Sequence, residues 1–255
     1  MMNDTDSAYQ DTVARGNMYS FLSAIYLQAP TQDLVKKIID VEFIEELASL
    51  FSEGSVAELR NYSGAVDIEK AVVLIKQDYM DLFAVPAGRY VMPFEDIYRG
   101  TRMDGHQERG PLLGTQAISV KIMYRMAGAE MERSCKELPT HIGVELGFMD
   151  YLCKRQATAI NNEWRTATLE EEIGTTSDSA VYREFQRRFL NSHLNDWFPQ
   201  LNKVIQEKAN THFYRGLAQV TEEFIASDTE SLMTQTIYEN PAQVIQVSSA
   251  IHQSG

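Results

Sequence analysis

His141 and Glu145 are the two side chains whose types and spacing suit chemistry most directly. They stand four positions apart, so on a helix they share one face and lie within reach of each other. Three roles fit this spacing: an ion pair that stabilises the helix, a recognition patch for a cationic segment, or a metal site. No third ligand has a suitable spacing and the HExxH pattern is absent, which disfavours the metal site.

A helix from Pro139 to about residue 160 is expected to carry this pair. Proline suits the first helical turn, where its missing N–H costs nothing, and Thr140 can accept a hydrogen bond as the N-cap. His141 and Glu145 fall beside the apolar stripe of this helix, so we expect both on its rim, neither fully buried nor fully exposed. The stripe itself is predicted to consist of Ile142, Leu146, Met149 and Cys153.

The end of an earlier helix is a second candidate site. Tyr79, Leu82 and Phe83 close an apolar helical stripe, and Pro86 follows in a loop that contains two prolines. Aromatic and aliphatic groups at such a junction can line a groove for a peptide, although they more often pack in the core.

Other common chemistries lack their patterns. The chain has no GxSxG, no GxGxxG and no GxxxxGK[ST]. Its carboxylates are scattered, as in any acidic protein, so no pair can be assigned a catalytic role.

Composition indicates a globular protein of one domain over residues 1–255. The chain has 44% hydrophobic residues and a net charge of −13, which disfavours nucleic acid and anionic membranes as partners. It has no run of about 18 apolar residues and no basic, apolar leader at its start, so neither membrane insertion nor secretion is expected. Two cysteines without a CxxC pattern fit the reducing cytoplasm.

Hydrophobic spacing predicts an all-α fold of about ten packed helices and no strand. Gly54 and Gly64 are interpreted as loose connections, residues 101–110 as a surface segment, and residues 161–179 as a loop or hinge. Among the expected helices are 7–28, a short one from 31, 41–51, 68–82, a short one within 94–100, 112–133 and 139–160.

Four segments, in this order, resemble the TorD/DmsD family of chaperones that mature molybdenum redox enzymes. They are Tyr79-x-x-Leu82-Phe83-x-Val85-Pro86, then Pro93-Phe94-Glu95-Asp96-Ile97-Tyr98, then residues 137–152, and more weakly Phe189-Leu190-x-x-His193-Leu194-x-x-Trp197 with the segment around Phe213. Two positions depart from the family pattern. Thr140 replaces the usual Asp before the histidine, and Val85 replaces the usual Gly.

The resemblance implies a cytoplasmic chaperone that is not an enzyme. Such a protein binds the twin-arginine signal peptide, the apo-precursor, or both, of a molybdopterin oxidoreductase catalytic subunit, assists cofactor insertion and controls export. It implies a monomer or a domain-swapped homodimer exchanging at 161–179, no permanent cofactor, and transient molybdenum cofactor or guanine nucleotide at most. The implied client-binding residues are Tyr79, Leu82, Phe83, Pro86, Tyr98, Glu137, Pro139, Thr140, His141 and Glu145.

Three alternatives stay open. Within the same class, a NarJ-like chaperone would assemble a nitrate reductase subunit that is not exported. In a different class, an all-helical metal protein or enzyme would use His141 and Glu145. The third is a helical adaptor without a link to molybdenum.

Overall fold

The computed structural model describes residues 4–63, 67–100, 102–103, 106–107, 110–167 and 178–239. Its elements, in chain order, are α1 (Asp4–Leu27), α2 (Gln32–Ile38), α3 (Val41–Leu50), α4 (Glu53–Tyr62), α5 (Ile68–Tyr79), the π-helical segment η1 (Met80–Ala84), α6 (Glu95–Tyr98), β1 (Arg102–Met103), β2 (His106–Gln107), α7 (Thr115–Met126), α8 (Ile142–Ala167), α9 (Asp178–Phe189), the π-helical segment η2 (Leu190–Leu194), α10 (Asn195–Lys208) and α11 (His212–Glu239).

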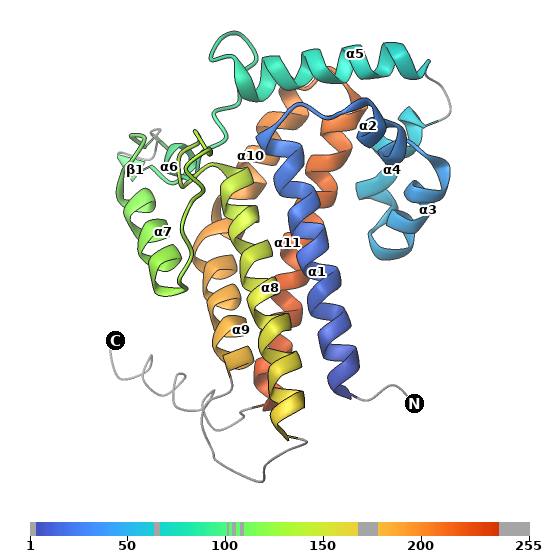
Figure 1. Cartoon of the computed structure of the whole chain (residues 1–255). Helices are drawn as coiled ribbons and strands as arrows, with labels where there is room; N and C mark the ends of the chain where they lie inside the picture. Colours follow the sequence, from blue (N-terminus) through green and yellow to red (C-terminus); the bar gives the residue numbers. More distant parts are fainter. Residues whose placement is uncertain are drawn as a thin grey trace.

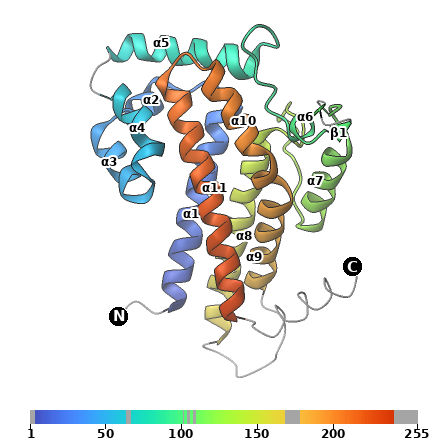
Figure 2. The same ribbon diagram turned by 180° about the vertical axis from the view of Figure 1, so that it is seen from behind.

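The long helices form a bundle around which the short elements are arranged. Helices α1, α8, α9 and α11 run side by side, and α5 lies across one end of them (Figures 1 and 2). Helices α2, α3 and α4 cover one flank, while α6, the hairpin of β1 and β2, and α7 lie on the opposite flank. The two motif segments that precede α8 in the chain are therefore held on one side of the upper bundle.

The bundle is joined through its centre by a polar layer as well as by apolar packing. Arg15 on α1 forms an ion pair with the buried Asp228 of α11, and Tyr19 donates to the same carboxylate at 2.5 Å. Arg15 also donates to Gln186 of α9 at 2.6 Å, and Gln186 donates to Gln156 of α8 at 2.9 Å. Because a buried charge is tolerated only when it is paired, this layer fixes how the four helices align.

Side-chain caps account for where the short helices begin. Thr31, Asp40, Ser52 and Asp67 each accept backbone N–H groups in the first turns of α2, α3, α4 and α5. The expectation of a loose connection at Gly54 was wrong, because Ser52 starts α4 directly before it. Glycine costs little at the beginning of a helix compared with its middle.

Two π-helical segments interrupt the regular helices, and both fall in motif segments. In η1 the N–H of Val85 reaches the carbonyl of Met80 at 2.8 Å, directly after the Tyr79 motif begins. Segment η2 contains His193 and lies between α9 and α10. A π-segment inserts an extra residue into a helix and often marks a functional position, because it turns the following side chains to a new face.

The predicted all-α class is confirmed, with differences in detail. Helix α7 is shorter than the predicted 112–133, and β1 and β2 pair antiparallel in the segment where no strand was expected. Helix α8 begins three residues later than predicted and continues to Ala167, so the first part of the proposed hinge is helical. The rest of that hinge, 168–177, lies outside the described residues. Within the described ranges, the helices are too short or too polar to cross a membrane.

Gly143 allows α1 and α8 to approach closely. A Cβ added there would lie 2.6 Å from Cγ of Leu27 and 3.1 Å from the carbonyl oxygen of Ser23. Ser23 in turn donates its hydroxyl to the carbonyl of Gly143 at 2.6 Å, so the two helices cannot shift apart without losing this bond.

Replacing Gly143 with Ala should therefore lower the free energy of unfolding, by about 1–3 kcal/mol, because the methyl group overlaps α1. Urea denaturation of both proteins measures this directly. Gly54→Ala is the matched control, since a Cβ at position 54 would meet only Ser52 Oγ at 3.9 Å. If the Gly143→Ala variant is as stable as the control, the contact with α1 does not restrict the side chain at position 143.

Candidate functional site

Two buried carboxylates on the short helix α6 form the centre of the candidate site. Glu95 is fully buried and Asp96 is 3% exposed, although α6 has only one turn. Burying carboxylates is costly unless hydrogen-bond donors surround them. The donors come from α7, from the segment that starts α8, and from η2 and α10. We call these buried residues the signature cluster: Glu95, Asp96, Thr140, His141, Glu145, His193 and Trp197.

Asp96 holds the starts of two helices. Its Oδ2 accepts the hydroxyl of Thr140 at 2.8 Å, and its Oδ1 accepts the backbone N–H of Ala117 in α7 at 3.3 Å. Next to it, the N–H of Glu95 donates to the carbonyl of Thr140 at 2.9 Å. The second and third motif segments thus pair like two short strands, through an antiparallel bridge between Phe94 and His141.

Glu95 contacts two cationic or ionisable groups. Nδ1 of His193 lies 2.9 Å from Oε2, and a guanidinium nitrogen of Arg99 donates to Oε1 at 2.8 Å. The other ring nitrogen of His193 lies 3.3 Å from Oγ of Ser119 on α7. His193 is 1% exposed and both of its ring nitrogens have partners, so it is a core histidine whose hydrogen bonding is satisfied.

Glu145 is fully buried and shares its environment with Glu95. Its Oε2 accepts the indole N–H of Trp197 at 3.0 Å, while its Oε1 faces no donor. Burial, and after it the charge of Glu95, raises the pKa of Glu145 well above its usual range. The raised pKa favours the protonated form of Glu145, in which its carboxyl group can donate a hydrogen bond to Glu95.

His141 caps α8 from inside the protein. Its Nδ1 accepts the N–H of Gly143 at 3.0 Å, and its ring packs edge-on against Phe94 with the ring centres 5.3 Å apart. Burial lowers the pKa of His141 to about 3, so the ring is neutral at physiological pH. The predicted rim position of His141 and Glu145 was wrong, because the α6 segment covers both. Thr140 was predicted as the cap, but its hydroxyl serves Asp96 instead.

The structure buries several of the predicted client-binding residues. Tyr79, Leu82 and Phe83 belong to the hydrophobic core, and the carbonyl of the buried Pro139 accepts the hydroxyl of Tyr124 at 2.9 Å. Of the predicted residues, Pro86 and Glu137 are exposed, and Tyr98 is half-buried. Tyr98 stacks on Trp197 with 5.6 Å between ring centres and donates to the carbonyl of Val91 at 2.5 Å.

Glu137 joins the first and third motif segments at the surface. Burial and the negative charge of Glu137 together raise the pKa of Tyr79, to about 12, and that of the half-buried Tyr90. These two tyrosines belong to the first motif and the loop after it. We call the accessible residues above the signature cluster the outer rim: Pro86, Tyr90, Tyr98 and Glu137.

The loop between η1 and α6 is held from both sides. Arg89 pairs with Asp78 and with Asp81, each at 2.6 Å, and donates to the carbonyl of Lys208 at 2.8 Å. Lys208 donates to the carbonyl of Tyr90 at 2.8 Å. The sequence reasoning missed Arg89 and Asp78. Glu95 and Asp96 could have been identified from the sequence, because they are two adjacent acids inside an apolar segment.

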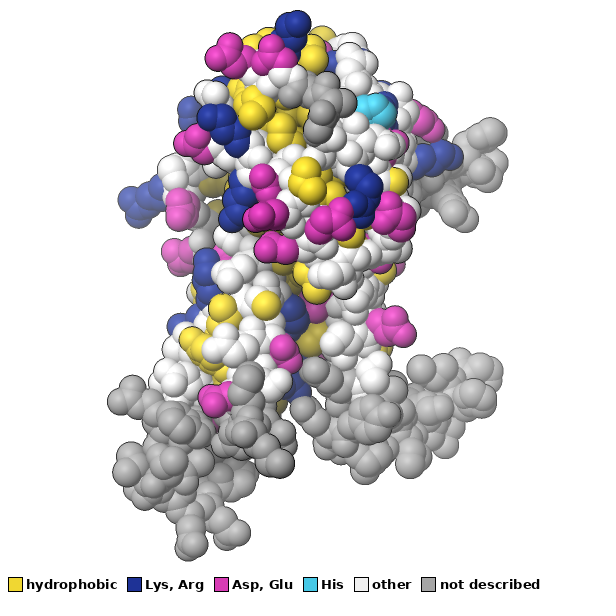
Figure 3. Space-filling model, turned by 90° about the vertical axis from the view of Figure 1, so that its right-hand side faces the viewer, with side chains coloured by type: hydrophobic (Ala, Val, Ile, Leu, Met, Phe, Trp, Pro, Cys, Tyr) yellow, Lys and Arg dark blue, Asp and Glu magenta, His cyan; other side chains and the backbone are white. Residues whose placement is uncertain are grey.

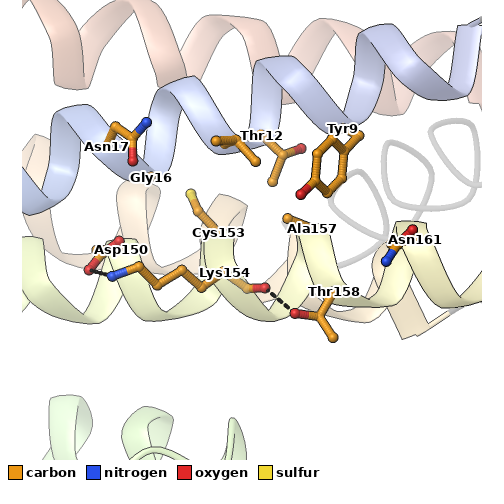
Figure 4. Close-up of a pocket in the computed structure, with 11 residues that line it drawn as sticks. Tyr9, Thr12, Gly16, Asn17, Asp150, Cys153, Lys154, Ala157, Thr158 and Asn161 are labelled. Carbon is orange, nitrogen blue, oxygen red and sulfur yellow. Dashed lines mark hydrogen bonds and ion pairs between the residues drawn. The ribbon is translucent and has the colours of Figure 1, made fainter.

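Among the described residues, no three His, Cys, Asp or Glu side chains are placed to hold a metal ion, so the metal-site alternative lacks its ligands. A pocket of about 330 Å³ lies elsewhere, between α1 and α8 (Figure 4). Asp150 and Lys154, 2.7 Å apart, line its α8 side together with Cys153.

The fold and the signature cluster define a helical binding protein. The motif residues of the cluster are buried and stabilise the fold. The family model described as "Nitrate reductase delta subunit" matches residues 52–203. A perchlorate reductase assembly chaperone protein of Dechloromonas aromatica is 28% identical over 142 residues, 56% of this chain and 55% of that protein. The chaperone protein TorD of Colwellia psychrerythraea is 24% identical over 88% of this chain and 94% of its own.

A selenate reductase assembly chaperone protein of Thauera selenatis is 22% identical, over 61% of this chain and 69% of its own. Since the family model covers more than half of the chain, this protein belongs to the nitrate reductase delta subunit family. Its named relatives are chaperones and not enzymes, and this chain is of the same class.

The low pKa of His141 predicts an acid-sensitive fold. Between the ordinary histidine pKa of 6.5 and about 3, the unfolded chain binds a proton that the folded chain excludes. Stability from this residue is complete above pH 6.5 and is lost as pH falls. His141→Asn keeps a capping oxygen without titrating, so between pH 6.5 and 5 the wild type should lose about 2 kcal/mol relative to the variant. Urea denaturation at several pH values measures this, and parallel curves would contradict it.

The raised pKa of Glu145 predicts the opposite dependence of stability on pH. Its pKa is higher in the folded state, so above about pH 4.5 the unfolded chain releases a proton that the folded chain retains, and stability falls as pH rises. Glu145→Gln can still accept from Trp197 and donate to Glu95 but does not titrate. As the pH is raised toward neutrality, we expect the free energy of unfolding of the variant to increase relative to that of the wild type, by up to about 1.4 kcal/mol per pH unit. If the wild type instead becomes more stable relative to the variant as pH rises, the raised pKa of Glu145 is refuted.

Proposed function

We propose that this protein is a cytoplasmic chaperone for the catalytic subunit of a molybdopterin oxidoreductase. In this proposal it binds the twin-arginine signal peptide of the precursor, the apo-precursor itself, or both, assists cofactor insertion and controls export. Family membership and relatives named TorD, perchlorate reductase and selenate reductase assembly chaperones support it. The observation that supports a contact site here is that backbone hydrogen bonds join the first three motif segments: the N–H of Val91, in the loop after the first motif, donates to the carbonyl of Leu82, and Phe94 pairs with His141.

The chemistry of the outer rim suits such a leader. A twin-arginine signal peptide offers two guanidinium groups and an apolar run. Glu137 supplies an exposed carboxylate, and Pro86, Tyr90 and Tyr98 supply apolar and aromatic surface beside it. A net charge of −13 adds long-range attraction for a cationic segment.

The buried predicted residues take a supporting role in this proposal. Tyr79, Leu82 and Phe83 hold the loop of the outer rim from below, and His141 and Glu145 hold the α6 segment. In this proposal the protein acts as a monomer or as a homodimer that exchanges elements at 161–179. Replacing His141 or Glu145 therefore tests the fold, and contact is better tested at the exposed Glu137.

A second candidate stays within the class. The matched family is named after a nitrate reductase subunit. This name supports a NarJ-like chaperone, whose client is not exported. Mass spectrometry of proteins that co-purify with the tagged chain separates the two. A molybdopterin subunit with a twin-arginine leader supports the first proposal, and a leaderless nitrate reductase subunit supports the second.

Glu137→Gln should weaken binding of a leader peptide several-fold, because an exposed carboxylate facing an arginine contributes roughly 0.2–1 kcal/mol or somewhat more when the pair is bidentate. The probe is a fluorescein-labelled peptide with two adjacent arginines and an apolar run of roughly 15 residues. Fluorescence anisotropy at low and high salt gives the affinity, and the loss should shrink at high salt.

Glu130→Gln is the matched control, since Glu130 is an exposed acid in the same segment between α7 and α8. A second control is the peptide with both arginines replaced by glutamine, which should not distinguish Glu137→Gln from the wild type. Equal affinity of both protein variants for the arginine peptide would remove Glu137 from the site.

A further inference from the structure

Helix α7 carries an apolar stripe on its outer face. Ile118, Ile122 and Met126 follow one another at four-residue spacing and are 60%, 50% and 63% exposed. Leu112 and Leu113, directly before the helix, are 43% and 54% exposed. Single exposed apolar side chains are common, but three at helical spacing, with two more directly before the helix, mark an interaction surface.

The opposite face of α7 is firmly attached. Ala117, Val120 and Tyr124 are buried, and Tyr124 packs between Phe148 and Phe189 with ring centres 4.4 and 6.1 Å away. Asp96 accepts the N–H of Ala117 near the start of the helix. The outer stripe is therefore held in place before any partner arrives, which lowers the entropic cost of binding.

The backbone before α7 holds one of these leucines outward. Leu113 has φ of +61°, a left-handed conformation that is unfavourable for leucine. Gly114 follows it and packs against Asp96, with a hypothetical Cβ only 3.3 Å from Oδ1. A strained backbone that exposes an apolar side chain beside a fixed carboxylate is a feature expected of a functional surface.

The charge of α7 differs from that of the rest of the chain. The chain contains 36 Asp and Glu, yet the twelve residues of α7 include none. Lys121 and Arg125 lie exposed beside the apolar stripe, and no ion pair to either is found in the described parts of the chain. By contrast, the face that carries α3 and α4 mixes acidic and basic side chains (Figure 3), for example Arg60 paired with Glu45 and Glu53.

We propose that the outer face of α7 docks an acidic amphipathic segment of a partner polypeptide. The apolar stripe would receive the apolar face of that segment, and Lys121 and Arg125 would meet its carboxylates. A second copy of this chain docking the same face would place these cations against each other, which disfavours it. This site is distinct from the outer rim, because the two select segments of opposite charge.

The test uses two labelled helical peptides that share a leucine stripe, one flanked by glutamates and one by lysines. Fluorescence anisotropy should show the wild-type protein binding the glutamate peptide at least about tenfold more tightly than the lysine peptide. Ile118→Ser with Ile122→Ser should weaken this binding about tenfold or more. Lys121→Glu with Arg125→Glu should reverse the preference between the two peptides.

Val73→Ser with Leu74→Ser is the matched control, because these residues are similarly exposed on α5, at 66% and 55%. It should leave binding of the glutamate peptide unchanged. Binding of the twin-arginine probe should be unaffected by the α7 serine variant, which leaves the net charge unchanged, so failure of this proposal is separable from failure of the proposed function. Circular dichroism checks that each variant is folded.

Three results would overturn the proposal. The first is equal affinity for both peptides, or affinity that the serine variant does not change. The second is a sedimentation shift from dimer to monomer in the serine variant, which would assign the face to a second copy of the chain. The third is co-sedimentation of the wild type, but not of the charge-reversed variant, with phosphatidylglycerol vesicles, which would assign it to a membrane surface.

Discussion

The burial of two carboxylates on a one-turn helix is the constraint on which the upper half of the molecule depends. Removing Glu95 and Asp96 from water is unfavourable unless each meets donors, and apart from Arg99 at the end of α6 these donors come from other elements. Thr140 contributes a hydrogen-bond partner from the start of α8, Ala117 contributes one from α7, and His193 contributes one from η2. The placement of three helices therefore follows from satisfying two side chains.

This constraint changes how the shared motifs of the family are understood. Glu95, His141 and Glu145 sit inside the protein, where a neutral imidazole and a protonated carboxyl group complete the hydrogen bonding. Family motifs can thus be kept by the demands of a buried polar network, which is costly when partly satisfied. In the proposed function, binding is left to neighbouring exposed positions such as Pro86 and Glu137.

Much of the fold could be predicted because helix periodicity is local, and so are the caps of α2 and α3. The site could not be predicted to the same extent. The four-residue spacing of His141 and Glu145 predicted a shared helical face, but only the long-range pairing of Phe94 with His141 decides that both are covered. Likewise Thr140 has the right chemistry for a cap, and its use by Asp96, 44 positions away in sequence, is a tertiary effect. Helix α7 ends early because Gly128 adopts a positive φ that closes it.

The polar layer of the bundle also has a consequence for biosynthesis. Arg15 and Tyr19 of α1 find their carboxylate on Asp228, more than 200 positions later, and Tyr26 meets Thr221. The guanidinium of Arg15 therefore meets its carboxylate only after α11 has been synthesised. Contacts of such high sequence separation form late. The polar layer that aligns the bundle can therefore form only once α11 has been made, and until then Arg15 and Tyr19 on α1 lack the carboxylate that they share.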